Sequence, residues 1–288
     1  MSKLTSMPEP EHPMVKLTAG YQMMGKYVSF FCSGCGYGII AQCLCRAFDK
    51  LKLDPIKFPK ILGIGCHSLM AFIVPGPAMM VLHGRAIPIA TGMKLANPEI
   101  KPIVITGDGD CLAIGTNHFV HAARRNVDMV VLITTNYIYG MTGGQVSPTT
   151  PFGSKTTTSV YGNAERSIDV VKLAKACGAT YIARWTTAHP RQLTKAIMEA
   201  IQHKGFSVIE VVSQCVTYYG RFNNLRGAPA MYKWLKENSV RIDKVGGSEE
   251  MGNKIVVGKF LEEKNVPTLR ERYEIIFEKV RKQVCKGE

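Results

Sequence analysis

The sequence of 288 residues lacks any long hydrophobic run. Its longest apolar stretches, residues 70–74 and 129–133, are far shorter than the about 20 residues that a transmembrane helix needs. No basic segment followed by a cleavable apolar run opens the chain. These absences predict a cytoplasmic protein that does not enter a membrane.

Acidic residues are scarce relative to basic ones, with 22 Asp and Glu against 36 Lys and Arg, and the formal net charge is +14. Such an excess favours anionic partners, for example phosphorylated cofactors or acidic proteins. The sequence has no arginine-rich run interleaved with aromatic residues, so nucleic-acid binding is not expected. A basic surface that is merely solvated would explain the charge equally well.

Internal repeats and low-complexity tracts are also lacking, and a content of 46% hydrophobic and 20% charged residues is typical of a globular protein. Nine cysteines are present. In a reducing cytoplasm, such cysteines are expected to be metal ligands or buried thiols rather than a disulfide framework.

The stretch from residue 101 to 151 has the clearest structural pattern. An apolar run at 103–105 ends in the glycine turn 107–110, a helical pattern begins near Thr116, and a second apolar run covers 129–133. The order strand, turn, helix, strand is typical of the βαβ unit of a parallel sheet. This alternation continues further along the chain and predicts an α/β fold with a doubly wound, mostly parallel sheet.

Two polar side chains follow these strands, Asp108 after the first and Asn136 after the second. Open parallel sheets bind ligands at the carboxyl ends of their strands, and a right-handed crossover brings these two ends together. A carboxylate and an amide oxygen suit Mg²⁺, and the helix expected from about Gly115 would offer N–H groups to an anion. Taken singly, however, a Gly-Asp-Gly turn is usually only a turn, and such an Asn is often only a cap.

A Cys-x2-Cys pair, Cys32 and Cys35, needs two further ligands to complete a metal site or a cluster. Cys66, in the glycine-rich segment 63–67, and Cys215, after an apolar strand, are the candidates. Both are expected at the sheet edge that carries Asp108.

A zinc site made by Cys32, Cys35, Cys43 and Cys45 is an alternative, and spacing alone does not separate zinc from iron. Cys43 lies on the apolar stripe of a predicted helix and is expected to be buried in the core. Cys45 lies off that stripe and is expected to be a spare thiol.

Three segments together resemble the β subunit of 2-oxoacid:ferredoxin oxidoreductases: GDGD, IGTNHFVHAARRN and IYGMTGGQVSPTTP. The resemblance implies a thiamine diphosphate-binding fold of the pyrophosphate type. It also implies that Asp108, Asn136 and the carbonyl of Ile138 hold Mg²⁺ on the diphosphate.

The family also holds a 4Fe-4S cluster near its thiamine, and Cys32, Cys35, Cys66 and Cys215 match its cysteines in order and local context. Ser33 replaces a proline that the family often has, a change that should not affect ligation. By resemblance, the four thiols therefore bind a 4Fe-4S cluster, while a zinc site built by the same thiols remains the alternative.

The HGRA and ATGMKLANP segments also resemble the family, which makes His83 a candidate cofactor contact, although a histidine beside a glycine is often only a loop residue. The cofactor contacts that the resemblance implies are Ile64, Gly65, Cys66, His67, His83, Gly109, Asp110, Gly140 and Met141.

The implied activity is oxidative decarboxylation of a 2-oxo acid to acyl-CoA and CO₂, with electrons passing through the cluster to ferredoxin. The MTGGQ loop (141–145) resembles the 2-oxoglutarate and branched-chain members, and Gly144, in place of a lysine, leaves it without a partner for a substrate carboxylate. The favoured substrate is 2-oxoglutarate, branched-chain, aryl or pyruvate-type acids are the alternatives, and side-chain selection is expected to rest largely on the other subunit. Two alternative functional classes are a subunit of a non-oxidative thiamine lyase and a structural subunit that is stabilised by a zinc ion.

No catalytic residue is identified in this chain. The glutamate that activates thiamine in such enzymes is expected from a partner α (or α/γ) subunit, so the isolated chain is expected to be inactive. The predicted organisation is an N-terminal arm (1–27), an α/β domain for thiamine diphosphate and the iron-sulfur cluster (28–229), and a helical C-terminal extension (230–288). Its last helix, 269–284, carries an apolar stripe that could dock on this domain or on a partner.

Overall fold

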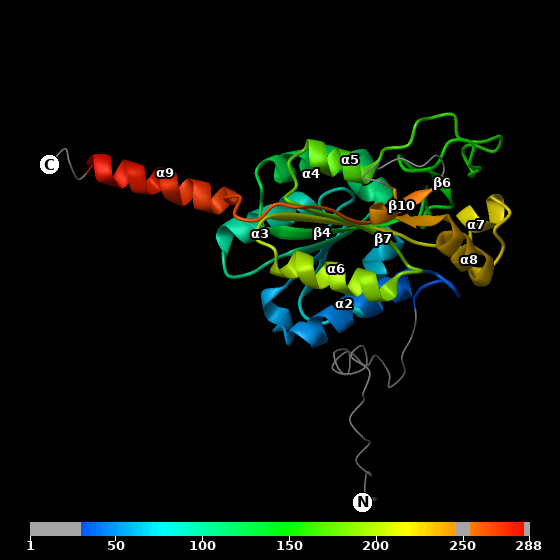
Figure 1. Cartoon of the computed structure of the whole chain (residues 1–288), viewed down its shortest axis with the longest axis horizontal. Helices are drawn as coiled ribbons and strands as arrows, with labels where there is room; N and C mark the ends of the chain where they lie inside the picture. The colour runs from blue at the N-terminus through cyan, green and yellow to red at the C-terminus, as the bar shows by residue number, and fades with distance from the viewer. Residues whose placement is uncertain (1–29, 246–253, 285–288) are drawn as a thin grey trace, which may run out of the picture.

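The computed structural model describes residues 30–245 and 254–284. Its centre is an eight-stranded sheet with the order β2-β1-β3-β4-β8-β7-β10-β9, in which neighbouring strands are parallel except for β7 and β10. Helices cover both faces, with α4 and α5 above the sheet and α2 and α6 below it in Figure 1. The predicted α/β, doubly wound, mostly parallel architecture is confirmed.

The strands of the main sheet, in chain order, are β1 Lys60–Leu62, β2 Ala78–Met80, β3 Ile103–Gly107, β4 Met129–Thr135, β7 Tyr181–Thr186, β8 Phe206–Val212, β9 Ser239–Arg241 and β10 Ile255–Glu262. A separate hairpin pairs β5 Ile138–Tyr139 with β6 Gln145–Val146. The α-helices are α2 Tyr37–Leu51, α3 Ala86–Ala96, α4 Thr116–Arg124, α5 Val170–Ala176, α6 Pro190–Gln202, α7 Tyr219–Phe222, α8 Ala228–Asn238 and α9 Leu269–Val284.

The middle strands β3, β4 and β8 are buried along their whole length. Their sequences are therefore nearly continuous apolar runs, as expected for strands covered on both faces. One hydrophobic cluster lies between the sheet and helices α2 and α6, and a second lies between the sheet and helices α3, α4 and α5. Because helices pack on both faces of the sheet, the carboxyl ends of the parallel strands β1, β3 and β4 are held together at one edge of the sheet.

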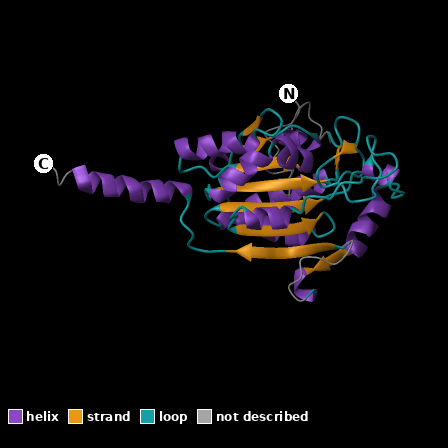
Figure 2. Ribbon diagram, turned by 90° about the horizontal axis from the view of Figure 1, so that it is seen from above, coloured by secondary structure: helices purple, strands orange, loops and turns teal. Residues whose placement is uncertain are grey.

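The C-terminal region differs from the helical extension that the sequence suggested. Residues 239–241 and 255–262 form two strands of the main sheet, β9 and β10, and Figure 2 shows the long one running antiparallel to the adjacent long strand, β7. The expected boundary at residue 229 lies inside helix α8. The helical prediction was wrong for β10 because its buried apolar start, Ile255 to Val257, pairs with β9 and the rest of the strand pairs with β7.

Helix α9 is confirmed as a helix, and it extends away from the body of the protein (Figure 1). Its predicted apolar stripe of Tyr273, Ile276, Phe277 and Val280 is exposed. No helix within residues 30–245 and 254–284 is long and apolar enough to cross a bilayer. The expected N-terminal arm lies outside the described residues.

Lys60 is a buried cation at the start of β1. Its side chain is fully buried, and its Nζ has no hydrogen-bond partner among the described residues and lies 5.2 Å from the centre of the Phe48 ring. Burial lowers the pKa of Lys60 to about 8, although a nearby thiolate at Cys45 would oppose the shift. Cys43 is buried as expected, but Cys45 is also fully buried, so the spare-thiol prediction was wrong.

Lys60→Met should stabilise the protein by about 1–3 kcal/mol at neutral pH, because it removes an unpaired buried charge. Between pH 8 and the ordinary lysine pKa of about 10.5, the unfolded chain binds a proton that the folded chain does not, so wild-type stability rises with pH there. The difference in unfolding free energy between the variant and the wild type, measured by denaturant unfolding, should therefore decrease as the pH rises over that range. Lys57→Met, at an exposed position, is the control, and an equal effect of both variants would contradict the prediction.

Candidate cofactor site

A cleft of about 160 Å³ opens where β1, β3 and β4 end. It is lined by all the cofactor and magnesium residues that the sequence predicted: Ile64, Gly65, Cys66, His67, His83, Asp108, Gly109, Asp110, Asn136, Ile138, Gly140 and Met141. Sequence reasoning missed four other lining residues, which are Tyr37, Gly107, Tyr139 and Thr142. The topology therefore gathers residues from five separate segments, and their roles in binding stay predictions.

Asp108 is the buried carboxylate at the end of β3. Its Oδ2 accepts hydrogen bonds from the Ser147 hydroxyl (2.8 Å), the Thr149 hydroxyl and the Tyr137 N–H (3.1 Å). Burial raises the pKa of Asp108, and the bonds from Thr149 and Ser147 oppose that rise. Because these three bonds meet on one oxygen, the carboxylate has a fixed orientation.

Asn136 follows β4 and begins a tight turn. Its Oδ1 accepts the Ile138 N–H at 3.2 Å, and Tyr137 between them has a φ of 67°, in the left-handed region. The Thr150 hydroxyl donates to the carbonyl of Tyr137 at 2.5 Å. This turn brings the Asn136 amide and Ile138 to the same cleft as Asp108, where oxygen donors could meet a hard cation.

Asp110 joins three segments of the cleft. Its Oδ2 accepts the Thr106 hydroxyl at 2.6 Å, and its Oδ1 accepts the N–H groups of Gly84 (2.7 Å) and Ile64 (3.3 Å). Helical structure begins here, with a π-helical turn at Asp110–Ile114, five residues before the start expected near Gly115. Asp110 lines the cleft, but its oxygens are already used by the protein itself.

Two histidines flank this carboxylate. His83 Nδ1 lies 2.9 Å from Asp110 Oδ1, and His67 Nε2 lies 3.5 Å from Oδ2. Burial alone would raise the pKa of Asp110, but His67 and the hydrogen bonds bring it below its ordinary value. The His67 contact has poor hydrogen-bond geometry, so its buried Nε2 is without a hydrogen-bond partner among the described residues.

The four cysteines singled out by the sequence lie near one another. Burial raises the pKa of Cys35 to about 12, and the charges of Cys215, Cys66 and Cys32 raise it further. Burial likewise raises the pKa of Cys66 to about 11, with added effects from Cys215 and Cys32. Such mutual effects require proximity, so these four thiols lie in one region of the fold, and their role as a ligand set stays a prediction. Cys43 instead contacts the Pro190 carbonyl in the core.

The cysteine group and the cleft are neighbours. A Cβ placed on Gly140 would lie 3.5 Å from both the Cys66 sulfur and the Asn136 amide nitrogen. The loop with Cys35 is tied to the segment before Cys215, because the Gly36 N–H donates to the Gln214 carbonyl at 3.3 Å. Within the described part of the chain, no three His, Cys, Asp or Glu side chains are placed to hold one metal ion.

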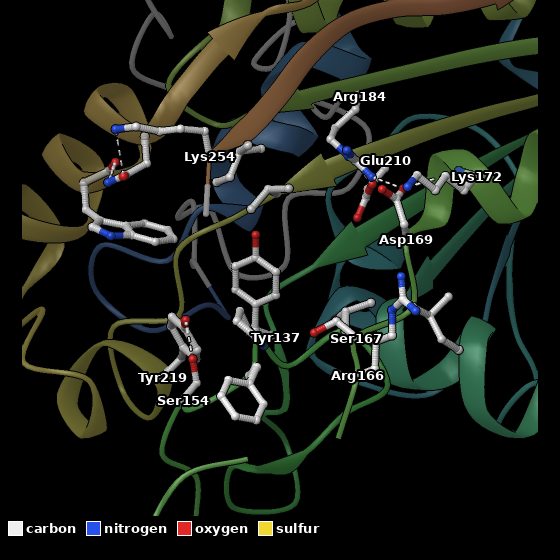
Figure 3. Close-up of a pocket in the computed structure, with 18 residues that line it drawn as sticks. Tyr137, Ser154, Arg166, Ser167, Asp169, Lys172, Arg184, Glu210, Tyr219 and Lys254 are labelled. Atoms are coloured by element: carbon white, nitrogen blue, oxygen red, sulfur yellow. Dashed lines mark hydrogen bonds and ion pairs between the residues drawn. The ribbon is translucent and has the colours of Figure 1, made fainter. Parts of the chain in front are cut away.

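A second and larger cleft of about 850 Å³, which the sequence did not predict, has Tyr137 in its wall (Figure 3). Arg184 lies in it between two carboxylates, 2.5 Å from Glu210 and 2.6 Å from Asp169. Tyr137 and Thr149 belong to its wall and also hydrogen-bond to Asp108. Two of the residues that orient Asp108 in the first cleft therefore also line the second.

Comparisons with known proteins agree on one family. Residues 63–211 match the family described as thiamine pyrophosphate enzyme, C-terminal TPP binding domain. The chain is 48% identical to the 2-oxoglutarate synthase subunit KorB of Methanocaldococcus jannaschii, over 92% of this chain and 97% of that protein. The chain belongs to the β subunits of the 2-oxoacid:ferredoxin oxidoreductases. This β subunit is therefore part of a thiamine diphosphate-dependent enzyme that requires other subunits.

Other relatives support the same assignment. The β subunit of the 2-oxoacid:ferredoxin oxidoreductase of Saccharolobus solfataricus is 37% identical, with 84% of each chain covered. A solved structure, the 2-oxoglutarate:ferredoxin oxidoreductase from Magnetococcus marinus with 2-oxoglutarate, coenzyme A and succinyl-CoA bound, matches with a TM-score of 0.80 and 31% identity, covering 88% of each chain. The family resemblance and the thiamine diphosphate-binding fold expected for this β subunit are confirmed.

Asp110→Ala should cost about 3 kcal/mol of unfolding free energy, because it leaves buried N–H and hydroxyl donors from three segments unpaired. Chemical denaturation monitored by circular dichroism measures this loss. Asp243→Ala is the control, since Asp243 forms only an exposed pair with Arg241 and should change stability by less than about 0.5 kcal/mol. Similar losses for both variants would contradict the assigned role of Asp110.

Proposed function

We propose that this β subunit binds thiamine diphosphate through Mg²⁺ beside a 4Fe-4S cluster and, with its partner subunit, oxidises 2-oxoglutarate to succinyl-CoA and CO₂. The observation that carries the proposal is the meeting of two sets of residues at one sheet edge. Oxygen donors from the ends of β3 and β4 line a cleft whose wall contains Cys66, one of four neighbouring thiols.

The donor set fits a magnesium-bound diphosphate. Asp108 has one oxygen fixed by protein donors, which leaves Oδ1 as the atom we expect to meet the cation. The side chain of Asn136 and the carbonyl of Ile138 would add two more oxygen ligands, as Mg²⁺ prefers. The buried Nε2 of His67 and the ring of His83 at the rim are the groups that would donate to diphosphate oxygens.

The four thiols fit an iron-sulfur cluster better than a single zinc ion. Zinc would need all four sulfurs within about 2.3 Å of one point. Cys32, Cys35, Cys66 and Cys215 influence one another electrostatically, which fits a shared group but does not by itself separate zinc from iron. A cluster takes four cysteine ligands around several iron atoms, and the family to which the chain belongs favours it over zinc.

The residues of this chain would bind and orient the cofactor, and none of them is assigned a proton transfer. When bound, thiamine diphosphate supplies the nucleophilic carbon that attacks the 2-oxo carbon and releases CO₂. Tyr37, Ile138 and Met141 give the cleft apolar walls that limit access of water. The partner subunit is proposed to supply the activating glutamate, together with much of the substrate pocket.

The loop 141–145 offers no cation to a substrate carboxylate. Gly144 has a φ of 90°, and a Cβ there would lie 2.9 Å from Tyr218, so a larger residue would strain the loop. The Thr142 hydroxyl is hydrogen-bonded to the Gln145 side chain. Selection of 2-oxoglutarate therefore rests on the partner, and branched-chain, aryl or pyruvate-type acids are the alternative substrates.

The variants Asp108→Ala and Cys215→Ser should show that the thiamine diphosphate site and the iron-sulfur site can be lost independently of each other. In the anaerobically purified holoenzyme, Asp108→Ala should lose bound Mg²⁺ and thiamine diphosphate and keep about four iron atoms per β subunit. Cys215→Ser should lose iron and acid-labile sulfide and retain most of the thiamine diphosphate. Cys177→Ser, a half-buried cysteine outside the group, is the matched control and should keep both. Retention of thiamine diphosphate in Asp108→Ala would contradict the magnesium assignment.

The reaction itself is tested with the wild-type holoenzyme and a panel of 2-oxo acids. We expect CoA-dependent ferredoxin reduction, with the highest kcat/KM for 2-oxoglutarate. CO₂ release without electron transfer would instead indicate a non-oxidative lyase. Zinc in place of iron, without thiamine diphosphate, would indicate a structural subunit.

A further inference from the structure

The edge of the cysteine group that faces solvent is formed by the loop of Cys32. Cys32, Ser33 and Gly34 are exposed, whereas the other three cysteines of the group are half-buried. If a cluster occupies this position, as the proposed function states, its exposed edge lies at this loop. Electron transfer weakens steeply with distance, so an acceptor protein has to approach from this side.

The loop packs against the segment that contains α7 and α8. A Cβ on Gly34 would lie 2.3 Å from the Cβ of Ala228 and 3.7 Å from Val216. Arg226 is two residues before Ala228 and exposed, so its Cα lies within about 7 Å of that contact. Arg221, also exposed, follows Cys215 by six residues in α7.

The charges around this edge are mostly basic. Residues 213–238 contain four basic residues, at positions 221, 226, 233 and 236, and one acidic residue, Glu237, which pairs with Lys233 at 3.8 Å. The other two cysteine-bearing segments, 30–38 and 63–72, contain neither Asp nor Glu. An acidic partner would therefore meet attraction from α7 and α8 and no repulsion from the loops that carry the cysteines.

The same edge offers a small apolar contact. Phe30 and Phe72 are 41% and 47% exposed, and their ring centres are 5.2 Å apart, which links the Cys32 loop to the loop after Cys66. A few exposed aromatic rings with a basic rim suit a transient electron-transfer complex, which is usually small and steered by charge.

We propose that the basic surface of α7 and α8, centred on Arg221 and Arg226 beside the Cys32 loop, is the docking site for a small acidic ferredoxin. The proposal rests on the proposed function. Each oxidation of a 2-oxo acid to acyl-CoA and CO₂ releases one proton and two electrons. Two ferredoxins dock in turn, and each leaves with one electron.

The test uses the assembled holoenzyme with all its subunits and a small acidic ferredoxin at low ionic strength. Arg221→Glu combined with Arg226→Glu should raise the KM for ferredoxin about tenfold and flatten its dependence on salt. Reduction of methyl viologen, a small cation that needs no docking surface, should be unchanged. Because Arg221 stacks on Tyr218 and Phe222, Arg226→Glu alone serves as a second variant that leaves these contacts intact.

Arg272→Glu combined with Arg281→Glu is the matched control. It makes the same charge change on α9, which lies at the opposite end of the molecule from α7 and α8 (Figure 1). An equal rise in KM in this control, or an unchanged KM in both docking variants, would overturn the proposal. So would failure of a folded Arg226→Glu chain to assemble with its partner, which would assign this surface to the subunit interface. If the wild-type enzyme reduces no ferredoxin with any 2-oxo acid, the proposed function itself fails.

Discussion

The site depends on one buried carboxylate that the protein orients before any ligand arrives. Asp108 lies at the end of a strand covered on both faces, where a charge is costly unless it is hydrogen-bonded. Ser147, Thr149 and the turn at Tyr137 supply those bonds, and all of them reach the same oxygen. The carboxylate is therefore preorganised, and little ordering remains to be done when a cation binds.

The sequence predicted the parts of the site that local chemistry specifies. The run 103–105, the glycine turn and Asn136 indicated two parallel strands with polar ends, and parallel strands place such ends at one edge. The pairing of Cys32 and Cys35 with Cys66 and Cys215 came from the family resemblance, because spacing alone left the local quartet open. The fold buries Cys43 and Cys45 in the core, and the ligand set stays a prediction.

Other features could not be predicted from local sequence patterns, because they depend on contacts between residues that are distant in the sequence. Ser147 and Thr149 look like ordinary loop residues, and only the folded chain brings them to Asp108. The strand at Ile255–Glu262 is a short apolar run within a charged region, and its pairing with β7 decides its structure. Asp110 was predicted to contact the cofactor, yet its oxygens are used to join three segments of the protein.

Cys66 and His67 are consecutive residues whose side chains lie in two different environments. The sulfur of Cys66 belongs to the cysteine group, and the imidazole of His67 lies buried in the cleft beside Asp110. A recombination or loop exchange at this position would replace both at once. A single peptide bond therefore joins the cysteine group to the lining of the cleft, so a shift of the backbone here would move both.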